Sequence, residues 1–130
     1  MSERNVAPTQ PVILSARPEH DEYWFREGCH ITELSNSKTD EAASIARVRL
    51  PAGGQTRWHA LADTTERYVI LSGQGEVELS DLPPCAVVAN DVVIIPPGCR
   101  QRIRNTGDND LEFLAICSPR FRDRNYQDLE

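Results

Sequence analysis

The feature that most constrains the fold of this chain is a pair of patterns in which turn-forming and polar residues recur at fixed intervals. The first pattern, G-x5-H-x-L-x4-E-x6-G, is formed by Gly53, His59, Leu61, Glu66 and Gly73. The second, N-x5-P-x-G-x2-Q-x3-N, is formed by Asn90, Pro96, Gly98, Gln101 and Asn105. Glycine tolerates positive φ and proline fixes φ, so both residue types favour turns at the ends of strands. The spacing therefore favours short strands separated by tight turns.

The residue pattern around these positions is that of β-strands, with no long helical period. Short apolar or alternating segments are each closed by Gly, Pro or Asn/Asp turns. The predicted strands are Ser44–Leu50, Glu66–Ser72, Glu76–Leu79, Asp91–Ile95, Arg100–Asn105 and Leu111–Cys117, with edge strands expected in Glu22–Phe25 and Cys29–Leu34. Strands of this length and spacing indicate an all-β sandwich or barrel.

Composition narrows the class of protein. A chain of 130 residues is the size of one domain. The 14 Lys and Arg against 20 Asp and Glu give a net charge of −6, which argues against a nucleic-acid partner. No apolar run approaches the ~18 residues of a membrane span, and no hydrophobic secretory signal is visible, so we expect no membrane partner and a cytoplasmic location. Free thiols are expected at Cys29, Cys85, Cys99 and Cys117.

The two patterns resemble the two motifs of the cupin family, G-x5-H-x-H-x4-E-x6-G and G-x5-P-x-G-x2-H-x3-N. Of the ten motif positions, three depart from the family pattern, at Leu61, Asn90 and Gln101, so seven match. The resemblance covers Ser44 to Ser118. It implies one cupin-type double-stranded β-helix, a jelly-roll barrel, over residues 12–118. A flexible N-terminal tail (1–11) and a C-terminal tail (119–130) packing on the barrel, with Phe121 and Tyr126 as its anchors, complete the expected organisation.

Alternation along one strand predicts which of its side chains face inward. In Arg100–Asn105, the three arginines share one face, and Gln101 and Ile103 lie on the other. Burying three unpaired charges inside a small barrel is too costly, so the arginines are expected to face solvent. Gln101 and Ile103 then point into the barrel.

The strand Ser44–Leu50 carries a second pair of arginines. Arg47 and Arg49 lie on one face of this strand. The simplest expectation is a solvated face or ion pairs with Glu76 and Glu78, which also share a face. Binding of an anionic ligand at the barrel mouth is the alternative.

The cupin resemblance places candidate metal ligands at three positions. His59 and Glu66 occupy ligand positions of the family, and Gln101 stands where a third ligand, a histidine, is usual. Leu61, in place of the second histidine, cannot bind a metal, and an amide oxygen is a weaker donor than imidazole or carboxylate. One hypothesis is a weakly bound divalent ion (Zn, Mn, Ni or Fe) on His59, Glu66 and Gln101. The other is a metal-free, hydrogen-bonded polar cluster.

Leu61 also affects the chemistry expected of Glu66. An apolar neighbour without a metal raises the pKa of a buried carboxyl, which suits a general acid or base. His59 is the expected proton partner, so Glu66 and His59 are the candidate catalytic residues. Leu61, Tyr68 and Ile103 are predicted to line the substrate pocket.

Two classes of function follow from this site. The first is a cupin-fold protein that binds a small-molecule ligand, with or without metal. The alternative is an enzyme of proton-transfer chemistry, an isomerase, cyclase or lyase. A dioxygenase is disfavoured, because oxygen activation at iron normally uses two or three imidazoles and this site offers one. A homodimer is the expected assembly, since cupin-like barrels often pair through their sheets.

Overall fold

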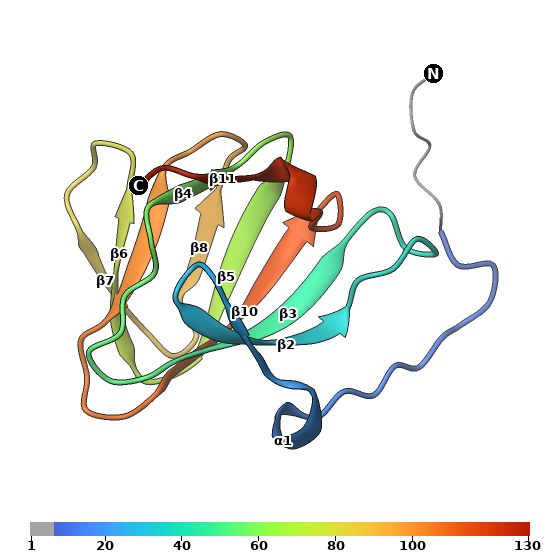
Figure 1. Ribbon diagram of the computed structural model, residues 1–130, viewed down its shortest axis with the longest axis horizontal. Coiled ribbons are helices and arrows are strands. Elements are labelled where there is room, and N and C mark those ends of the chain that lie inside the picture. The colour runs from blue at the N-terminus through green and yellow to red at the C-terminus, as the bar shows by residue number, and fades with distance from the viewer. Residues whose placement is uncertain (1–6) are drawn as a thin grey trace.

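The computed structural model describes residues 7–130 and contains two antiparallel β-sheets that face each other (Figure 1). The first sheet has the order β1 (Tyr23–Phe25), β2 (Cys29–Ser35), β3 (Ser44–Leu50), β10 (Leu111–Ser118), β5 (Thr65–Ser72) and β8 (Val92–Ile95). The second has the order β11 (Tyr126–Asp128), β4 (His59–Leu61), β9 (Gln101–Asn105), β6 (Gln74–Leu79) and β7 (Cys85–Val88). One helical turn, α1 (Pro18–Asp21), precedes β1, and a 3-10 turn, η1 (Asp123–Asn125), precedes β11. This architecture confirms the predicted all-β jelly roll.

The described residues begin inside the predicted N-terminal tail. Residues 1–6 of the expected 1–11 segment lie outside them. None of the helices within residues 7–130 has the length and apolar character needed to cross a lipid bilayer.

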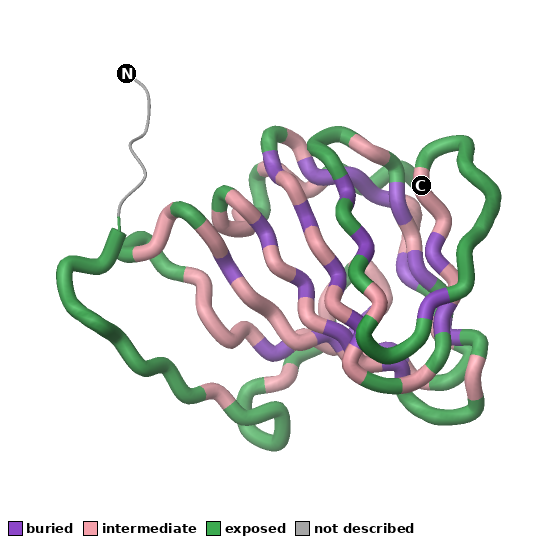
Figure 2. The backbone as a smooth tube through the Cα atoms, turned by 180° about the vertical axis from the view of Figure 1, so that it is seen from behind, coloured by how far each residue is buried: buried purple, intermediate pink, exposed green. Residues whose placement is uncertain are grey.

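The core lies between the two sheets and follows the alternation of the strands. In β10, every second residue from Leu111 to Cys117 is buried, and β5 shows the same pattern from Glu66 to Ile70. Figure 2 shows buried positions recurring along the strands of both sheets. The largest core side chains are fully buried, among them Leu50, Ile70, Ile95, Ile103, Leu111 and Phe113. Burial of such side chains is the main stabilising term of a fold of this size.

The inward and outward faces predicted for β9 are confirmed. Gln101 is 1% exposed and Ile103 is 0% exposed. Arg102 and Arg104 lie on the opposite face, where each forms an ion pair at 3.1 Å with a glutamate of the adjacent strand β6.

The ion pairs predicted between β3 and β6 are wrong. The two glutamates of β6 are taken by the arginines of β9, the neighbour of β6 in the second sheet. Arg47 of β3 instead pairs with Glu112 of β10 at 3.2 Å. Arg49 pairs with Glu22, just before β1, at 2.7 Å. Alternation predicted correctly which face of β3 carries these arginines. It could not predict their partners, because these depend on which strands lie next to β3, and β6 belongs to the other sheet.

The C-terminal segment lies against the barrel opening. Strand β11 pairs with β4, with Tyr126 opposite Leu61. The Tyr126 ring stacks on the imidazole of His59, with centroids 5.4 Å apart and planes at 15°. Phe25 contacts both aromatic rings of the tail, at 5.4 Å from Tyr126 and 6.3 Å from Phe121. These contacts bring the last twelve residues next to the candidate site.

Candidate functional site

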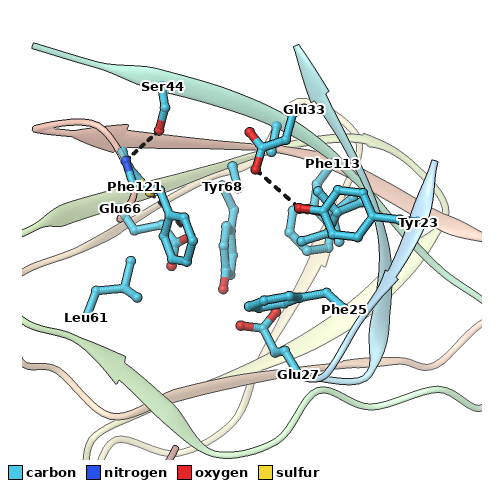
Figure 3. A pocket seen from close by; sticks show the side chains of 15 residues that line it. Tyr23, Phe25, Glu27, Glu33, Ser44, Leu61, Glu66, Tyr68, Phe113 and Phe121 are labelled. Carbon is cyan, nitrogen blue, oxygen red and sulfur yellow. Dashed lines mark hydrogen bonds between the residues drawn. The ribbon is translucent and has the colours of Figure 1, made fainter. Parts of the chain in front are cut away.

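A cavity of about 50 Å³ lies against the inner face of the first sheet and is closed on one side by the tail (Figure 3). Its aromatic lining consists of Tyr23, Phe25, Tyr68, Phe113 and Phe121. Its carboxyl groups are Glu27, Glu33 and Glu66. The remaining lining residues are Ile31, Ser44, Ala46, Val48, Leu61, Ala115 and Cys117. A single water needs only about 10–15 Å³ of such space, so the cavity has room for a molecule of a few heavy atoms.

The space exists because two small side chains lie side by side in the sheet. Ala46 of β3 is the cross-strand partner of Ala115 of β10. Ala46 is flanked on its other side by Glu33, and Ala115 by Tyr68. Cross-strand partners point to the same face of a sheet, so this row has long side chains at both ends and methyl groups in the middle. The register of the four strands β2, β3, β10 and β5 therefore forms the floor of the cavity.

Glu66 is the most unusual group of the lining. The residue is only 8% exposed. Its Oε2 accepts a weak hydrogen bond from Cys117 Sγ at 3.7 Å, whereas its Oε1 has no hydrogen-bond partner within residues 7–130. Burial, reinforced by the negative charge of Glu27, raises the pKa of Glu66 to about 7. Near neutral pH this carboxyl therefore exchanges readily between its protonated and ionised forms, as predicted from Leu61.

His59 is held from both sides of its ring. Its Nε2 lies 2.9 Å from Glu27 Oε1, and its Nδ1 lies 2.6 Å from the carbonyl oxygen of Arg57. A carbonyl and a carboxylate only accept hydrogen bonds, so both ring nitrogens act as donors. Burial opposes the charged form, but these two bonds and the charge of Glu27 outweigh burial and raise the pKa of His59 to about 9. His59 is therefore an imidazolium at neutral pH.

Glu27 is the site residue that the sequence patterns missed. It lies in the turn between β1 and β2, more than twenty residues before the first motif, and its side chain is 13% exposed. The turn is fixed by Gly28, whose φ of +108° favours glycine, and by a 2.8 Å hydrogen bond from Arg57 N to the Glu27 carbonyl. A Cβ at Gly28 would lie 3.0 Å from the carbonyl oxygen of Gln55. The glycine after Glu27 is the only local signal for this turn.

Gln101 lies next to the site and contacts two of its residues. Its Oε1 accepts a hydrogen bond of 2.5 Å from the Tyr68 hydroxyl. Gln101 is also the cross-strand partner of His59. Neither Gln101 nor His59 lines the cavity, but each contacts a residue that does, Tyr68 and Glu27 respectively.

The three predicted metal ligands do not fit a divalent ion in this arrangement. Both nitrogens of His59 are engaged, and the Gln101 oxygen accepts the Tyr68 proton. Of the three, only Glu66 has an oxygen without a partner in the described chain. No group of three or more His, Cys, Asp or Glu side chains in residues 7–130 is arranged to hold a metal. The arrangement instead provides an imidazolium–carboxylate pair beside a carboxyl with a raised pKa.

Of the predicted pocket residues, the structure places Leu61 and Tyr68 at the cavity. Leu61 reaches it from β4 and Tyr68 from β5. Ile103 faces inward, as alternation predicted, but packs in the hydrophobic core rather than at the cavity. The reason is its strand: β9 lies in the middle of the second sheet, whereas β1 and β2, which contribute residues to the cavity lining, lie at one end of the first sheet.

Known proteins resemble this chain in sequence and in fold. An oxalate-binding protein of Thermotoga maritima is 37% identical over 79 residues, which span 59% of this chain and 63% of that protein. An uncharacterized protein of Methanocaldococcus jannaschii is 27% identical over 94% of this chain and 98% of its own length. Among solved structures, the nucleoside dehydratase Pac13 superposes with a TM-score of 0.75 at 19% identity, covering 92% of each chain. A predicted oxalate decarboxylase of T. maritima superposes with a TM-score of 0.72 at 27% identity, covering 82% of this chain and 99% of its own.

The family assignment rests on a separate match, to a protein family as a whole. Residues 46–117, more than half of the chain, match the family described as "Cupin domain". The match contains both sequence patterns in full, because they run from Gly53 to Asn105. Together with the two-sheet jelly roll, this match shows that the chain belongs to the cupin family.

Proposed function

We propose that this protein binds a small organic molecule in the cavity around Glu66. The observation that carries the proposal is the buried carboxyl of Glu66, a residue of the cavity lining whose Oε1 has no hydrogen-bond partner in the described residues. A buried polar atom left unpaired costs roughly 1–3 kcal/mol, a cost that a ligand donating a hydrogen bond would remove. The cavity is concave and mostly apolar, with a few polar groups, as ligand sites usually are.

The comparisons support small-molecule binding without identifying the molecule. One relative is named for binding oxalate, and one structural neighbour is a nucleoside dehydratase that has also been solved with uridine. These ligands belong to those proteins. The cavity of this chain differs chemically from an anion site, because its lining within residues 7–130 includes three carboxyl groups and neither Lys nor Arg.

A cavity-filling variant tests this proposal. In Ala115→Leu, the added side chain would occupy the cavity floor between Ala46 and Tyr68. We expect ligand-observed NMR against a panel of small acids, alcohols, amines, sugars and nucleosides to find a ligand of the parent that Ala115→Leu does not bind. Ala86→Leu, at an exposed position of β7, is the matched control and should bind as the parent does. A panel in which every ligand binds parent and Ala115→Leu equally would contradict the proposal.

The alternative function is proton-transfer catalysis on the bound molecule, as an isomerase, cyclase or lyase. The observation that favours it is the Glu66 carboxyl, whose pKa of about 7 suits a general acid or base at neutral pH. Ionised Glu66 would accept a proton from the ligand, and protonated Glu66 would return it at another atom. The Glu27–His59 pair would hold one wall of the cavity with fixed charges during this exchange.

We also propose that the protein is a homodimer. The outer face of the first sheet carries aliphatic side chains on four neighbouring strands: Ile45, Val69, Val92, Ile94, Leu114 and Ile116. Val92 and Ile94 are 55% and 62% exposed. Arg67 lies on the same face, between Ile94 and Ile116. An exposed patch of aliphatic side chains is typical of an interaction surface, and a two-fold axis would cover it with the same face of a second copy.

The cysteines support a reducing compartment such as the cytoplasm. All four are free thiols in the described structure. Cys29 and Cys117 are buried beside Glu27 and Glu66, and burial raises the pKa of both thiols above the usual range. Buried protonated thiols pack as small apolar groups, which is typical of proteins that are not stabilised by disulfides.

A further inference from the structure

The charge of the cavity lining indicates what kind of molecule it accepts; this inference rests on the proposed function. The lining in residues 7–130 has three carboxyl groups but no Lys or Arg. One of the three, Glu27, is already balanced by the imidazolium of His59 at 2.9 Å. Glu33 and Glu66 remain on the cavity wall. An anion in this space would lie beside these carboxyl groups with no Lys or Arg of the lining to balance its charge, which is unfavourable in a partly desolvated site.

The two remaining carboxyl groups lack full stabilisation of their ionised forms. Glu33 accepts a single hydrogen bond of 3.3 Å from the Tyr23 hydroxyl (Figure 3). Glu66 Oε1 accepts none from the described chain. Burial raises the pKa of both groups, so desolvation outweighs the contacts that favour their charge. A positive charge in the cavity would stabilise the ionised forms of Glu33 and Glu66.

The aromatic residues of the lining also favour a positively charged ligand. Five of the fifteen lining residues are aromatic. The faces of aromatic rings attract cations within about 6 Å, and recognition of ammonium groups often combines such rings with carboxylates. The rings of Tyr68 and Phe113 lie 4.6 Å apart on the strands that also carry Glu66 and Ala115. Phe25, at the opposite side, already has the guanidinium of Arg26 at 5.0 Å from its centroid.

We propose that the ligand of this cavity is a small organic cation, a protonated primary amine with a short carbon chain. Its ammonium group donates to the carboxyl of Glu66 and lies within the field of Glu33, while its carbon chain packs on Leu61 and the aromatic rings. The volume of about 50 Å³ limits the chain to a few carbon atoms. Oxalate and other small anions are excluded by the charge of the lining.

This proposal predicts that the affinity for the ligand depends on pH, because binding is linked to the protonation of Glu66. A bound cation favours the ionised form of Glu66, so binding below about pH 7 must displace a proton from this carboxyl. Affinity should therefore rise between pH 6 and pH 8. The ordinary pKa of an alkylammonium, like that of Lys, lies near 10, so the ligand keeps its charge over this range.

The test compares three probes of the same shape and different charge. Isothermal titration calorimetry is run with propan-1-ammonium, propan-1-ol and propanoate, and with oxalate as the anion that a relative is named for. We expect propan-1-ammonium to bind the parent and to release protons at pH 6.5. The other three should bind at least about tenfold more weakly, as expected when a hydrogen bond to a charged group is lost.

Two variants show that binding takes place at Glu66. Glu66→Gln should weaken ammonium binding by about 10- to 100-fold, while Glu76→Gln, on the outer face beside Arg104, should leave it unchanged. Circular dichroism confirms that both variants fold. Equal ammonium binding in Glu66→Gln or in Ala115→Leu would overturn the inference, because it would mean binding elsewhere.

The remaining outcomes separate the inference from the proposed function. Cavity binding of propanol, propanoate or oxalate that is at least as tight as that of the ammonium would overturn the cation proposal and leave small-molecule binding intact. Failure of propan-1-ammonium to bind the parent also overturns the cation proposal. Small-molecule binding itself fails only if the wider panel yields no ligand that Ala115→Leu excludes.

Discussion

His59 Nε2 and Glu27 Oε1 lie 2.9 Å apart, with the second ring nitrogen of His59 fixed on the Arg57 carbonyl. This relationship joins the β1–β2 turn to the first sequence motif. It also engages the histidine that occupies a metal-ligand position in the family pattern. Both ring nitrogens of His59 are thereby bound within the protein, while Glu66, a residue of the cavity lining, has an oxygen without a partner in residues 7–130.

The Glu27–His59 pair makes stability depend on pH. The pKa of His59 is raised from 6.5 to about 9 on folding, so its contribution is complete below pH 6.5 and is lost as pH rises through 9. A shift of this size corresponds to at most about 3 kcal/mol. In Glu27→Gln, which removes the charge, the melting temperature should fall less between pH 6.5 and 9 than in the parent. A parent melting temperature that is flat over this window would contradict the ion pair.

Glu66 should reduce stability at neutral and alkaline pH. Its pKa rises from 4.5 to about 7 on folding, so the favourable protonated form is present below pH 4.5 and stability is lost as pH rises through 7. Glu66→Gln removes a cost of up to about 3 kcal/mol and should melt higher than the parent at pH 8, with a smaller difference at pH 5. Thermal melts at the two pH values, with Glu76→Gln as control, check this. A variant that melts lower at pH 8 would show that ionised Glu66 is stabilised.

Much of this fold could be predicted from sequence because its signals are local. Glycine and proline mark the turns, and alternation in β9 correctly separated the inward Gln101 and Ile103 from the outward arginines. Tyr68, predicted from the sequence to line the pocket, does line the cavity and alternates onto the same face of β5 as Glu66. Alternation depends only on the residues of one strand, so it predicts which side chains share a face whichever strands lie beside it.

What could not be predicted depends on strand order and on contacts between distant segments. Glu27 reaches His59 only because β1 and β2 extend the first sheet over the cavity. The same order places β3 beside β10, so Arg47 meets Glu112 rather than a glutamate of β6. Ile103 faces inward yet misses the cavity for the same reason. No motif spacing contains this information, because a strand's partner is set by the whole topology.

If the protein is a proton-transfer enzyme, Glu66→Gln should abolish most of its activity. The amide keeps the size of the carboxyl but cannot exchange a proton, so turnover should fall by about 10²–10⁴-fold. Binding of a neutral substrate should change far less. Steady-state kinetics on the substrate found through the ligand panel measures this. A variant with unchanged kcat would remove Glu66 from the chemistry.

Metal affinity should be weak in the parent and rise when donors are restored. Leu61→His and Gln101→His rebuild the usual cupin set, and Glu27→Gln releases His59 Nε2 from its ion pair. We expect the triple variant to bind zinc, nickel or manganese much more tightly than the parent by calorimetric titration, since each imidazole adds an inner-sphere nitrogen. The double variant without Glu27→Gln should be intermediate. Equal affinity in all three proteins would mean that these positions do not converge.

The outer face of the first sheet should control assembly. Ile94→Glu places a charge on the most exposed part of the proposed two-fold contact and should convert a dimer to a monomer, as measured by sedimentation velocity. Val88→Glu is the control, because Val88 is 51% exposed but lies on β7 of the second sheet. A parent protein that is monomeric at all concentrations would contradict the homodimer.

The most direct test of the account is an NMR titration of the Glu66 side-chain carboxyl, without and with propan-1-ammonium. The account predicts a midpoint near pH 7 in the free protein, because the carboxyl is buried and its Oε1 is unpaired within the described chain. Bound ammonium should move this midpoint to lower pH, and the same ligand should leave the carboxyl of Glu76 unchanged. A midpoint near the ordinary value of 4.5 in the free protein, or one that added ligand does not move, would contradict the claim that Glu66 is the ligand-binding group of the cavity.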